Sequence, residues 1–287
     1  MAGNRKALCV GINVFKNYPD ATLQGCVNDV ESMASLLKKY MGFVEADIVR
    51  LTDAQATKQA VIGNLQTMVA DAKAGKLNHL VFTYSSHGTQ VPDLNGDEPD
   101  RADEAFCPHD LAQSGNQWDR KHVIVDDELN SLFTKVPAGV LVEVFLDTCH
   151  SGTGLKAIDL LIDRKPRYLP PPSLEAFAEV ENRSLRGMGR QFLEKGLNHQ
   201  ILWAACRSDQ TSADAKIGGS FHGAFTYYLC KVIDASANRL SRKSVLQKVR
   251  AELKTNRYTQ VPQLECPATG RDVAPVTPQK ANRARRS

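Results

Sequence analysis

Short apolar runs alternate with longer amphipathic segments along the first half of the chain. The runs Lys6–Asn13, Ile48–Leu51 and Leu80–Tyr84 contain mostly apolar and β-branched residues, which is typical of buried strands. Between them, Cys26–Tyr40 and Thr57–Ala74 carry apolar residues at helical spacing. This order of strands and helices predicts parallel strands joined by right-handed crossovers, and therefore an α/β fold with helices on both faces of a sheet.

The second half repeats this pattern after an acidic interruption. Residues 92–119 are polar and rich in acids, so we expect an irregular excursion there, followed by a helix that begins near Asp126. The apolar runs Val140–Leu146 and Gln200–Ala205 predict two further buried strands. The remaining expected elements are two helices and a short closing segment, at Ala224–Ala235, Ser244–Asn256 and Gln263–Pro267.

Residues 156–198 do not follow the pattern. They contain many prolines and arginines with little periodicity, which predicts a long linker. We therefore expect one domain over residues 1–273, in which a larger part (1–155) and a smaller part (199–273) flank the linker. Residues 274–287 are basic and are expected to form a disordered tail.

Composition narrows the class of protein. The formal charge of +4 includes the basic tail, so we expect no nucleic-acid partner. No apolar run is long enough to span a bilayer and the first residues do not resemble a signal peptide, so we expect no membrane partner and a cytoplasmic location. The seven cysteines include no C-x-x-C pair, which argues against a disulfide framework or a structural zinc site.

Two predicted strands end in reactive side chains. His87 follows Leu80–Tyr84, and Cys149 follows Val140–Leu146. Because parallel strands present their carboxyl ends at one edge of a sheet, the two side chains can face each other there. A cysteine nucleophile needs a neighbouring base, and a histidine supplies one. The backbone N–H groups of Gly88 and Cys149 could form an oxyanion hole.

Other thiol chemistries fit the residues less well. A cysteine phosphatase needs an arginine at position 155, where this chain has Leu155, and a dithiol oxidoreductase needs a second cysteine near Gly152. Taken singly, Cys149 would be interpreted as a buried apolar residue and His87 as a loop histidine. Their occurrence together at two strand ends favours the catalytic interpretation.

With these motifs in place, the chain resembles the metacaspase and bacterial orthocaspase branch of the caspase-fold cysteine peptidases. The resemblance implies a three-layer α-β-α caspase-haemoglobinase fold with a mostly parallel central sheet. It also implies a cysteine endopeptidase that acts on proteins or peptides as a monomer. The matching stretches, spread over about residues 5–270, are Ala7–Asn13, Leu23–Asp29, Tyr84–Gly88, Asp147–Gly152 and Ser208–Asp214.

The resemblance also assigns roles to individual residues. His87 and Cys149 match the catalytic dyad, and Asp29 and Asp147 match acids of the S1 pocket, which implies cleavage after Arg or Lys. Two alternatives stay open. One is a caspase that cuts after Asp, for which Arg207 is the only argument. The other is a catalytically silent interaction module with the same fold.

The resemblance to this family also implies two regulatory features. Catalysis itself needs no cofactor, but Asp103, Asp126 and Asp127 resemble a calcium site of activatable metacaspases; helix capping by Asp126 and Asp127 is the alternative. At the fourth ligand position this chain has Lys156, which would repel the metal. The second feature is self-cleavage in the linker, although a solvated basic loop is an equal alternative. The candidate sites are Arg164, Lys165, Arg167, Arg183, Arg186 and Arg190.

Overall fold

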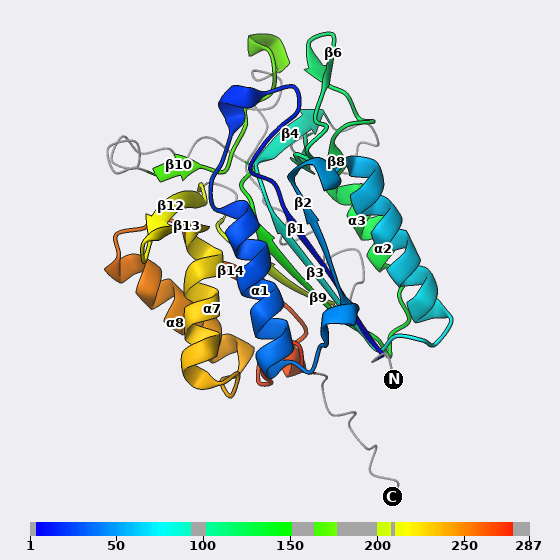
Figure 1. The fold of residues 1–287 in the computed structure, drawn as a ribbon, viewed down its shortest axis with the longest axis vertical. Coiled ribbons are helices and arrows are strands. Elements are labelled where there is room, and N and C mark those ends of the chain that lie inside the picture. Colours follow the sequence, from blue (N-terminus) through cyan, green and yellow to red (C-terminus); the bar gives the residue numbers. More distant parts are fainter. Residues whose placement is uncertain (1–3, 93–101, 151–163, 177–199, 208–209, 278–287) are drawn as a thin grey trace, which may run out of the picture.

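A six-stranded sheet forms the centre of the molecule (Figure 1). The structure is a computed structural model that describes residues 4–92, 102–150, 164–176, 200–207 and 210–277. The strand order is β14-β11-β9-β3-β1-β2, and all neighbours are parallel except β14, which runs antiparallel to β11. The strands are β1 (Arg5–Gly11), β2 (Ile48–Thr52), β3 (His79–Ser85), β9 (Leu141–Asp147), β11 (Gln200–Ala204) and β14 (Gln263–Glu265).

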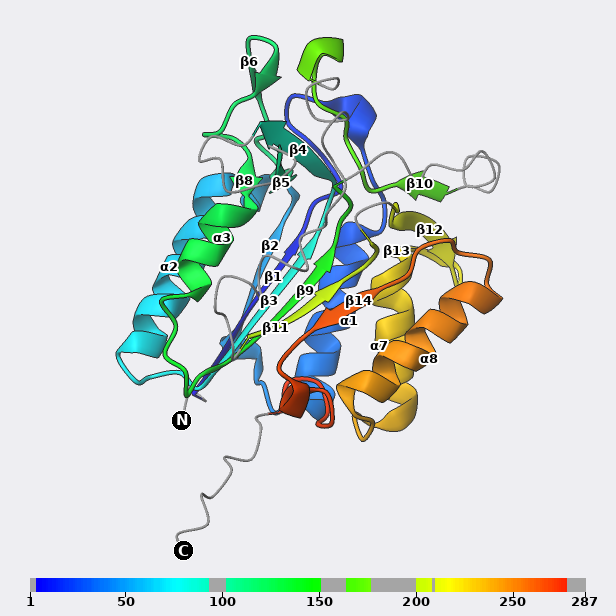
Figure 2. The same cartoon turned by 180° about the vertical axis from the view of Figure 1, so that it is seen from behind.

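Helices cover both faces of this sheet, so the predicted three-layer α/β class is confirmed (Figures 1 and 2). On one face lie α1 (Cys26–Tyr40), α7 (Ala224–Ser236) and α8 (Arg242–Thr255), and on the other α2 (Lys58–Lys73) and α3 (Asp126–Phe133). Each layer has its own buried apolar cluster against the sheet. None of the helices that the structure describes has the length and apolar character needed to cross a bilayer.

Three small antiparallel sheets lie outside the central one, and they correct the expectation of irregular structure at 92–119 and of a plain linker at 156–198. Their strands are short and contain many polar residues, so they lack the apolar runs by which the strands of the central sheet were predicted. They are β4 (Gly88–Pro92), β5 (Ala102–Phe106) and β8 (Ile124–Val125); β6 (Gln113–Ser114) and β7 (Gln117–Trp118); and β10 (Arg164–Pro166), β12 (Ala213–Ile217) and β13 (Ser220–Gly223). Short 3₁₀ turns occupy Pro19–Ala21, Glu45–Asp47, Asp53–Gln55 and Ala268–Gly270.

One buried ion pair joins α8 to the central sheet. Arg242 donates to the carboxylate of Glu143 on β9 (2.6 Å), and both side chains are completely buried. The same carboxylate accepts the indole N–H of Trp203 (2.7 Å) and the backbone N–H of Val276 (2.6 Å). Val276 is itself buried, so the packed chain extends past position 274, where we placed the start of the tail.

The register between β3 and β9 brings two loops together. Ser85 pairs with Asp147 at the carboxyl ends of these parallel neighbours. His87 and Cys149 each lie two residues beyond this pair, at the end of the sheet where β4, β10 and β12 gather (Figure 1). The topology therefore places both predicted catalytic residues at one edge, as open α/β sheets do with their functional loops.

Candidate active site

The His87 side chain is oriented as a base with one free ring nitrogen. Its ring packs against Phe15 (centroids 5.4 Å apart), and its Nε2 lies 2.7 Å from the carbonyl oxygen of Ala21. Because a carbonyl only accepts, Nε2 carries the proton and Nδ1 keeps its lone pair. Nδ1 is buried and has no hydrogen-bond partner in the described part of the chain. Burial lowers the pKa of His87 to about 3, so the ring is neutral.

The Cys149 sulfur is completely buried and is surrounded by donors. The backbone N–H of Ser212 donates to it, and the sulfur of Cys206 lies 3.0 Å away. The hydrogen bond to Cys149, together with burial, raises the pKa of Cys206 well above its ordinary value. Cys206 therefore stays a thiol, and its S–H can donate to Cys149 or to the carbonyl of Thr148 (3.7 Å). His87 does not hydrogen-bond to the Cys149 sulfur in this conformation.

The predicted oxyanion hole contains a carbonyl group of the protein itself. The N–H groups of Gly88 (3.0 Å) and Cys149 (3.2 Å) both donate to the carbonyl oxygen of Arg167. Only glycine fits at position 88, because a Cβ there would lie 2.0 Å from the carbonyl oxygen of Cys149. The two donors thus converge on one oxygen, as an oxyanion hole requires.

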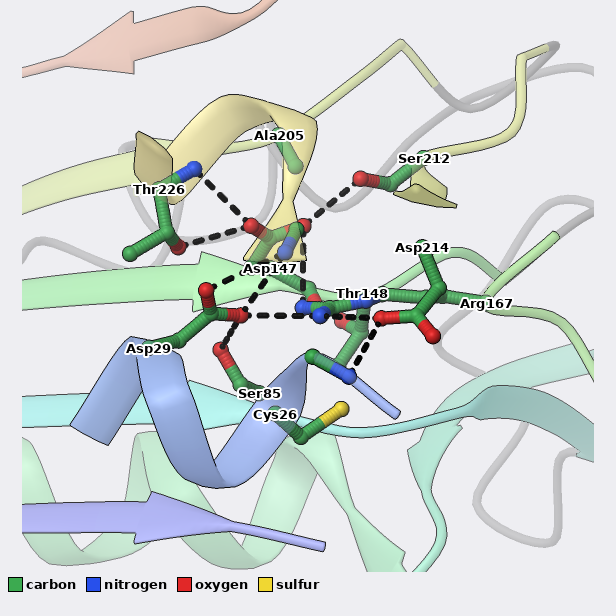
Figure 3. A network of polar contacts seen from close by, with 12 residues as sticks. Cys26, Asp29, Ser85, Asp147, Thr148, Arg167, Ala205, Ser212, Asp214 and Thr226 are labelled. Carbon is green, nitrogen blue, oxygen red and sulfur yellow. Dashed lines mark hydrogen bonds and ion pairs between the residues drawn. The ribbon is translucent and has the colours of Figure 1, made fainter. Parts of the chain in front are cut away.

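The side chain of Arg167 fills a buried pocket lined by three carboxylates (Figure 3). Its Nη2 contacts Asp29 (2.8 Å) and Asp214 (2.9 Å), and its Nη1 lies 3.4 Å from Asp147. Burial raises the pKa of Asp29, and Arg167 opposes that shift. Asp29 and Asp147 were predicted for this pocket from the sequence. Asp214 was quoted only as part of a motif, because its strand, β12, had not been predicted.

Neutral donors fix these carboxylates in place. Asp147 accepts from the hydroxyl of Ser212 (2.6 Å) and from the N–H (3.0 Å) and hydroxyl (2.7 Å) of Thr226. Asp29 accepts from the Gly223 N–H (3.1 Å), and Gly223 has no room for a Cβ, which would lie 2.2 Å from Asp147.

Asp214 is held in the same way, by backbone donors that precede α1. It accepts from the N–H groups of Gln24 (2.8 Å) and Gly25 (3.0 Å). A Cβ at Gly25 would lie 2.5 Å from the Asp214 carboxylate, so glycine permits this close approach. The three acids are therefore held in position by the fold around one guanidinium group, and His222 also approaches Asp29 (3.5 Å).

The segment around Arg167 crosses the site in an extended conformation. β10 pairs antiparallel with β12, the Arg167 N–H donates to the Ser212 carbonyl (2.9 Å), and the Leu169 N–H donates to the Gly88 carbonyl (2.9 Å). Of the cleavage candidates that the structure describes, Arg164, Lys165 and Arg167, only Arg167 has its carbonyl between the oxyanion donors. Arg183, Arg186 and Arg190 lie outside the described residues.

A hollow of about 340 Å³ opens beside His87. Its walls include Pro19, Ala21, Tyr168 and Leu169. Water can therefore reach the histidine side of the site without entering the carboxylate pocket. Arg207, on which the alternative of Asp specificity depends, is exposed to solvent. It is not among the residues that contact Arg167 in the carboxylate pocket.

The predicted calcium ligands do not form a metal site in the described part of the chain. No group of three or more His, Cys, Asp or Glu residues there could hold a metal ion. Asp103 instead pairs with Arg120 (2.7 Å), and Asp126 and Asp127 begin α3. Lys156 lies outside the described residues. Calcium activation thus stays a prediction without support from these residues, and we derive no step through the metal.

Comparison with known proteins agrees with the fold. The caspase domain family matches residues 4–273. Metacaspase-1 of Scheffersomyces stipitis is 33% identical over 92% of this chain and 71% of its own length. Metacaspase-1A of Aspergillus niger is 32% identical over 92% of this chain and 70% of its own length.

Two solved structures share the architecture. The crystal structure of a Geobacter sulfurreducens protein superposes with a TM-score of 0.65 at 26% identity, covering 96% of this chain and 99% of that one. Caspase-1 of Spodoptera frugiperda gives a TM-score of 0.59 at 12% identity over 92% and 87% of the two chains, a likeness in fold alone. The chain therefore belongs to the caspase-domain family of cysteine peptidases, and its similarity to the metacaspases extends over nearly its whole length.

Proposed function

We propose that the protein is an endopeptidase that cuts polypeptides after Arg or Lys, with Cys149 as nucleophile and His87 as base. We further propose that one of its substrates is its own Arg167–Tyr168 bond. The observation that carries both proposals is the position of Arg167. Its side chain lies among three carboxylates while its carbonyl oxygen accepts from Gly88 and Cys149.

The reaction follows from these positions. The Cys149 sulfur attacks the carbonyl carbon of the P1 residue, and its proton passes to His87 Nδ1. The N–H groups of Gly88 and Cys149 stabilise the negative oxygen of the tetrahedral intermediate. The peptide C–N bond then breaks, the amine leaves with the proton from His87, and a thioester remains on Cys149. Water from the hollow beside His87 hydrolyses the thioester and restores the thiol.

The pocket chemistry supports a cationic P1 residue. Three carboxylates buried together repel one another, and a guanidinium or ammonium group relieves that repulsion. An Asp side chain in the same place would add a fourth negative charge. Because the uncut segment occupies the whole site, other substrates enter only after it leaves, so cleavage after Arg167 precedes full activity.

Intact-mass measurement of the purified chain tests self-cleavage. We expect the wild-type protein to give fragments that end at Arg167 and begin at Tyr168, since among the described candidates only Arg167 has its carbonyl at the Gly88 and Cys149 donors. Cys149→Ala should stay whole, and Arg167→Gln should lose this cut. Lys165→Gln, which changes a neighbouring basic residue whose carbonyl is not at the oxyanion donors, is the matched control and should still be cut.

Short fluorogenic peptides test the activity towards other substrates. Peptides that end in Arg or Lys should be turned over and Asp-terminated ones should not. Turnover of Asp peptides would contradict the pocket assignment, and no turnover of any peptide would favour the silent interaction module. Equal rates with and without EGTA would exclude calcium as an activator. The monomeric state and the cytoplasmic location stay predictions.

A further inference from the structure

Arg164 occupies a binding site of its own, about three residues before the bond that Cys149 faces. Its guanidinium carbon lies 3.8 Å from the ring centroid of Tyr258. Nη1 donates to the carbonyl of Arg257 (2.8 Å) and Nη2 to the carbonyl of Asn256 (3.0 Å). The pairing of Arg164 with Ala215 in the β10–β12 ladder fixes its register. With Arg167 as P1, Arg164 is the P4 residue.

The carbonyls of this site come from the way α8 ends. The N–H of Arg257 donates to the carbonyl of Lys254 (3.0 Å) and that of Tyr258 to the carbonyl of Leu253 (2.9 Å). Arg257 adopts a φ of 59°. Together these features form a Schellman motif, which ends the helix and turns the next carbonyls outward. Carbonyl groups at a helix C-terminus carry partial negative charge, so a cation is favoured there.

The aromatic wall is held independently of Arg164. The Tyr258 ring meets Tyr228 of α7 edge-on, with centroids 5.9 Å apart, and Tyr228 contacts Tyr227 in the same manner at 5.2 Å. The flat ring and the two carbonyl groups are therefore held in place by the smaller part of the domain (199–273) itself, and not by Arg164. This arrangement matches a planar cation with several N–H donors.

We propose that Tyr258 and the carbonyls of Asn256 and Arg257 form an S4 subsite that selects arginine at the fourth residue before the cut in protein substrates. This proposal rests on the proposed function and extends it from the P1 residue to an Arg-x-x-Arg class of sequence. Arginine is preferred over lysine because its planar guanidinium stacks on the ring while two N–H groups reach two different carbonyls. A lysine ammonium cannot do both.

Four fluorogenic peptides with the sequence X-Lys-Pro-Arg, where X is Arg, Lys, Gln or Ala, test the S4 subsite on the self-cleaved full chain. We expect kcat/KM for the Arg peptide to exceed that for the Ala and Gln peptides about tenfold, with Lys between them. Tyr258→Leu should bring the Arg-to-Ala ratio close to one, whereas Tyr258→Phe should keep most of it. Tyr40→Leu, which removes a tyrosine under another cation at the end of α1, is the matched control.

The outcomes separate the two proposals. If no peptide of the series is hydrolysed, the proposed function fails. If all four are hydrolysed at equal rates, only the S4 subsite is wrong. An unchanged ratio in Tyr258→Leu would also overturn the subsite. Because the series on wild-type protein is informative by itself, the proposal stays falsifiable even if Tyr258→Leu does not fold.

Discussion

The carboxylates of Asp29, Asp147 and Asp214 share one cation in a pocket from which water is excluded. The fold holds these acids with backbone and hydroxyl donors, so they cannot move apart when the cation leaves. A pocket built in this way binds either a cation or protons. The proposed specificity for basic residues would thus follow from keeping repelling charges close together.

Asp214→Asn tests the acid that sequence reasoning missed. Loss of one charged contact to the P1 guanidinium should lower kcat/KM for Arg peptides by about 10- to 100-fold and slow self-cleavage. The measurement is steady-state hydrolysis of an Arg-terminated peptide. Asp234→Asn, an acid on the exposed face of α7 that pairs with Lys39, is the control and should be neutral. Equal rates for Asp214→Asn and wild type would remove Asp214 from the pocket.

His150 gives the protein a pH-dependent stability. Burial lowers the pKa of His150 to about 4 in the folded protein, against an ordinary value near 6.5, so the unfolded chain binds the extra proton between these values. The contribution of His150 to the free energy of unfolding should be fully present above about pH 6.5. It should be lost as the pH falls towards 4, a decrease on the order of 3 kcal/mol. The free energy of unfolding is measured by denaturant unfolding of the Cys149→Ala variant at several pH values.

His150→Gln should flatten this slope, since the group that gains the proton is gone. His122→Gln, which replaces a histidine that is 40% exposed, should leave the slope unchanged. Buried His79 and His87 have pKa values that burial lowers to about 4 and about 3, so they will sustain part of the dependence. A slope unaffected by His150→Gln would show that the proton is taken up elsewhere.

The residues at the reaction centre could be found from the sequence because each follows a strongly apolar strand. His87 and Cys149 lie two residues past β3 and β9, and the parallel topology alone brings them together. Asp214 and Cys206 gave no comparable signal. They act through partners 47 and 57 positions away, Arg167 and Cys149, and no local pattern records such contacts.

At the scale of elements, β9 contains a buried charge that its apolar sequence pattern did not indicate. It was predicted as an apolar strand, yet Glu143 in its middle is completely buried and paired with Arg242 of α8. The pair joins the central sheet to the last helix, and the Glu143 contact with the backbone of Val276 extends the link to the end of the packed chain. A strand pattern can therefore contain a buried charge when another element supplies its partner.

Arg242→Met should lower the free energy of unfolding by about 3–5 kcal/mol, because it leaves an unpaired buried carboxylate. The double variant Glu143→Gln/Arg242→Met should recover part of this loss, since Gln keeps hydrogen bonds to Trp203 or Val276 without the charge. Both are measured by denaturant unfolding on the Cys149→Ala background. Strictly additive losses would mean that the pair does not act as a unit.

Elements with a clear apolar pattern were predictable, and short polar strands were not. α1 begins at Cys26 and ends at Tyr40, as predicted, and α2 begins after Thr57, whose hydroxyl accepts from the Ala60 N–H as an N-cap. β10 and β12 have three and five residues and depend on pairing with each other rather than on a pattern of their own. The positions of His87 and Cys149 could be predicted from the sequence. The P1 pocket and the segment around Arg167 could not, because both depend on the pairing of β10 with β12.

At the scale of the whole molecule, the segment around Arg167 already lies in the candidate active site of the uncut chain. Self-cleavage should therefore be intramolecular, with a first-order rate constant that is the same over a wide range of dilution. The reaction can be started from protein whose Cys149 is masked as a mixed disulfide, by adding a thiol and following the two fragments on a gel. Wild-type protein added to the Cys149→Ala chain should cut it slowly, because the segment of that chain is held in its own site.

A rate constant that rises in proportion to protein concentration would contradict the intramolecular route. It would mean that one molecule presents Arg167 to the Cys149 of another. The Lys165→Gln chain is again the matched control, since it keeps Arg167 and its carbonyl contacts.

β9 and β11 come from opposite sides of the proposed cut after Arg167, yet they lie next to each other and parallel in the central sheet. What joins them is a backbone ladder and a shared core, neither of which the cut removes. A molecule cut at the proposed bond would thus be a split protein: it should migrate as one particle under native conditions and as two chains in detergent. Such a cut would leave a permanent mark that distinguishes every enzyme that has cleaved itself from every enzyme that has not.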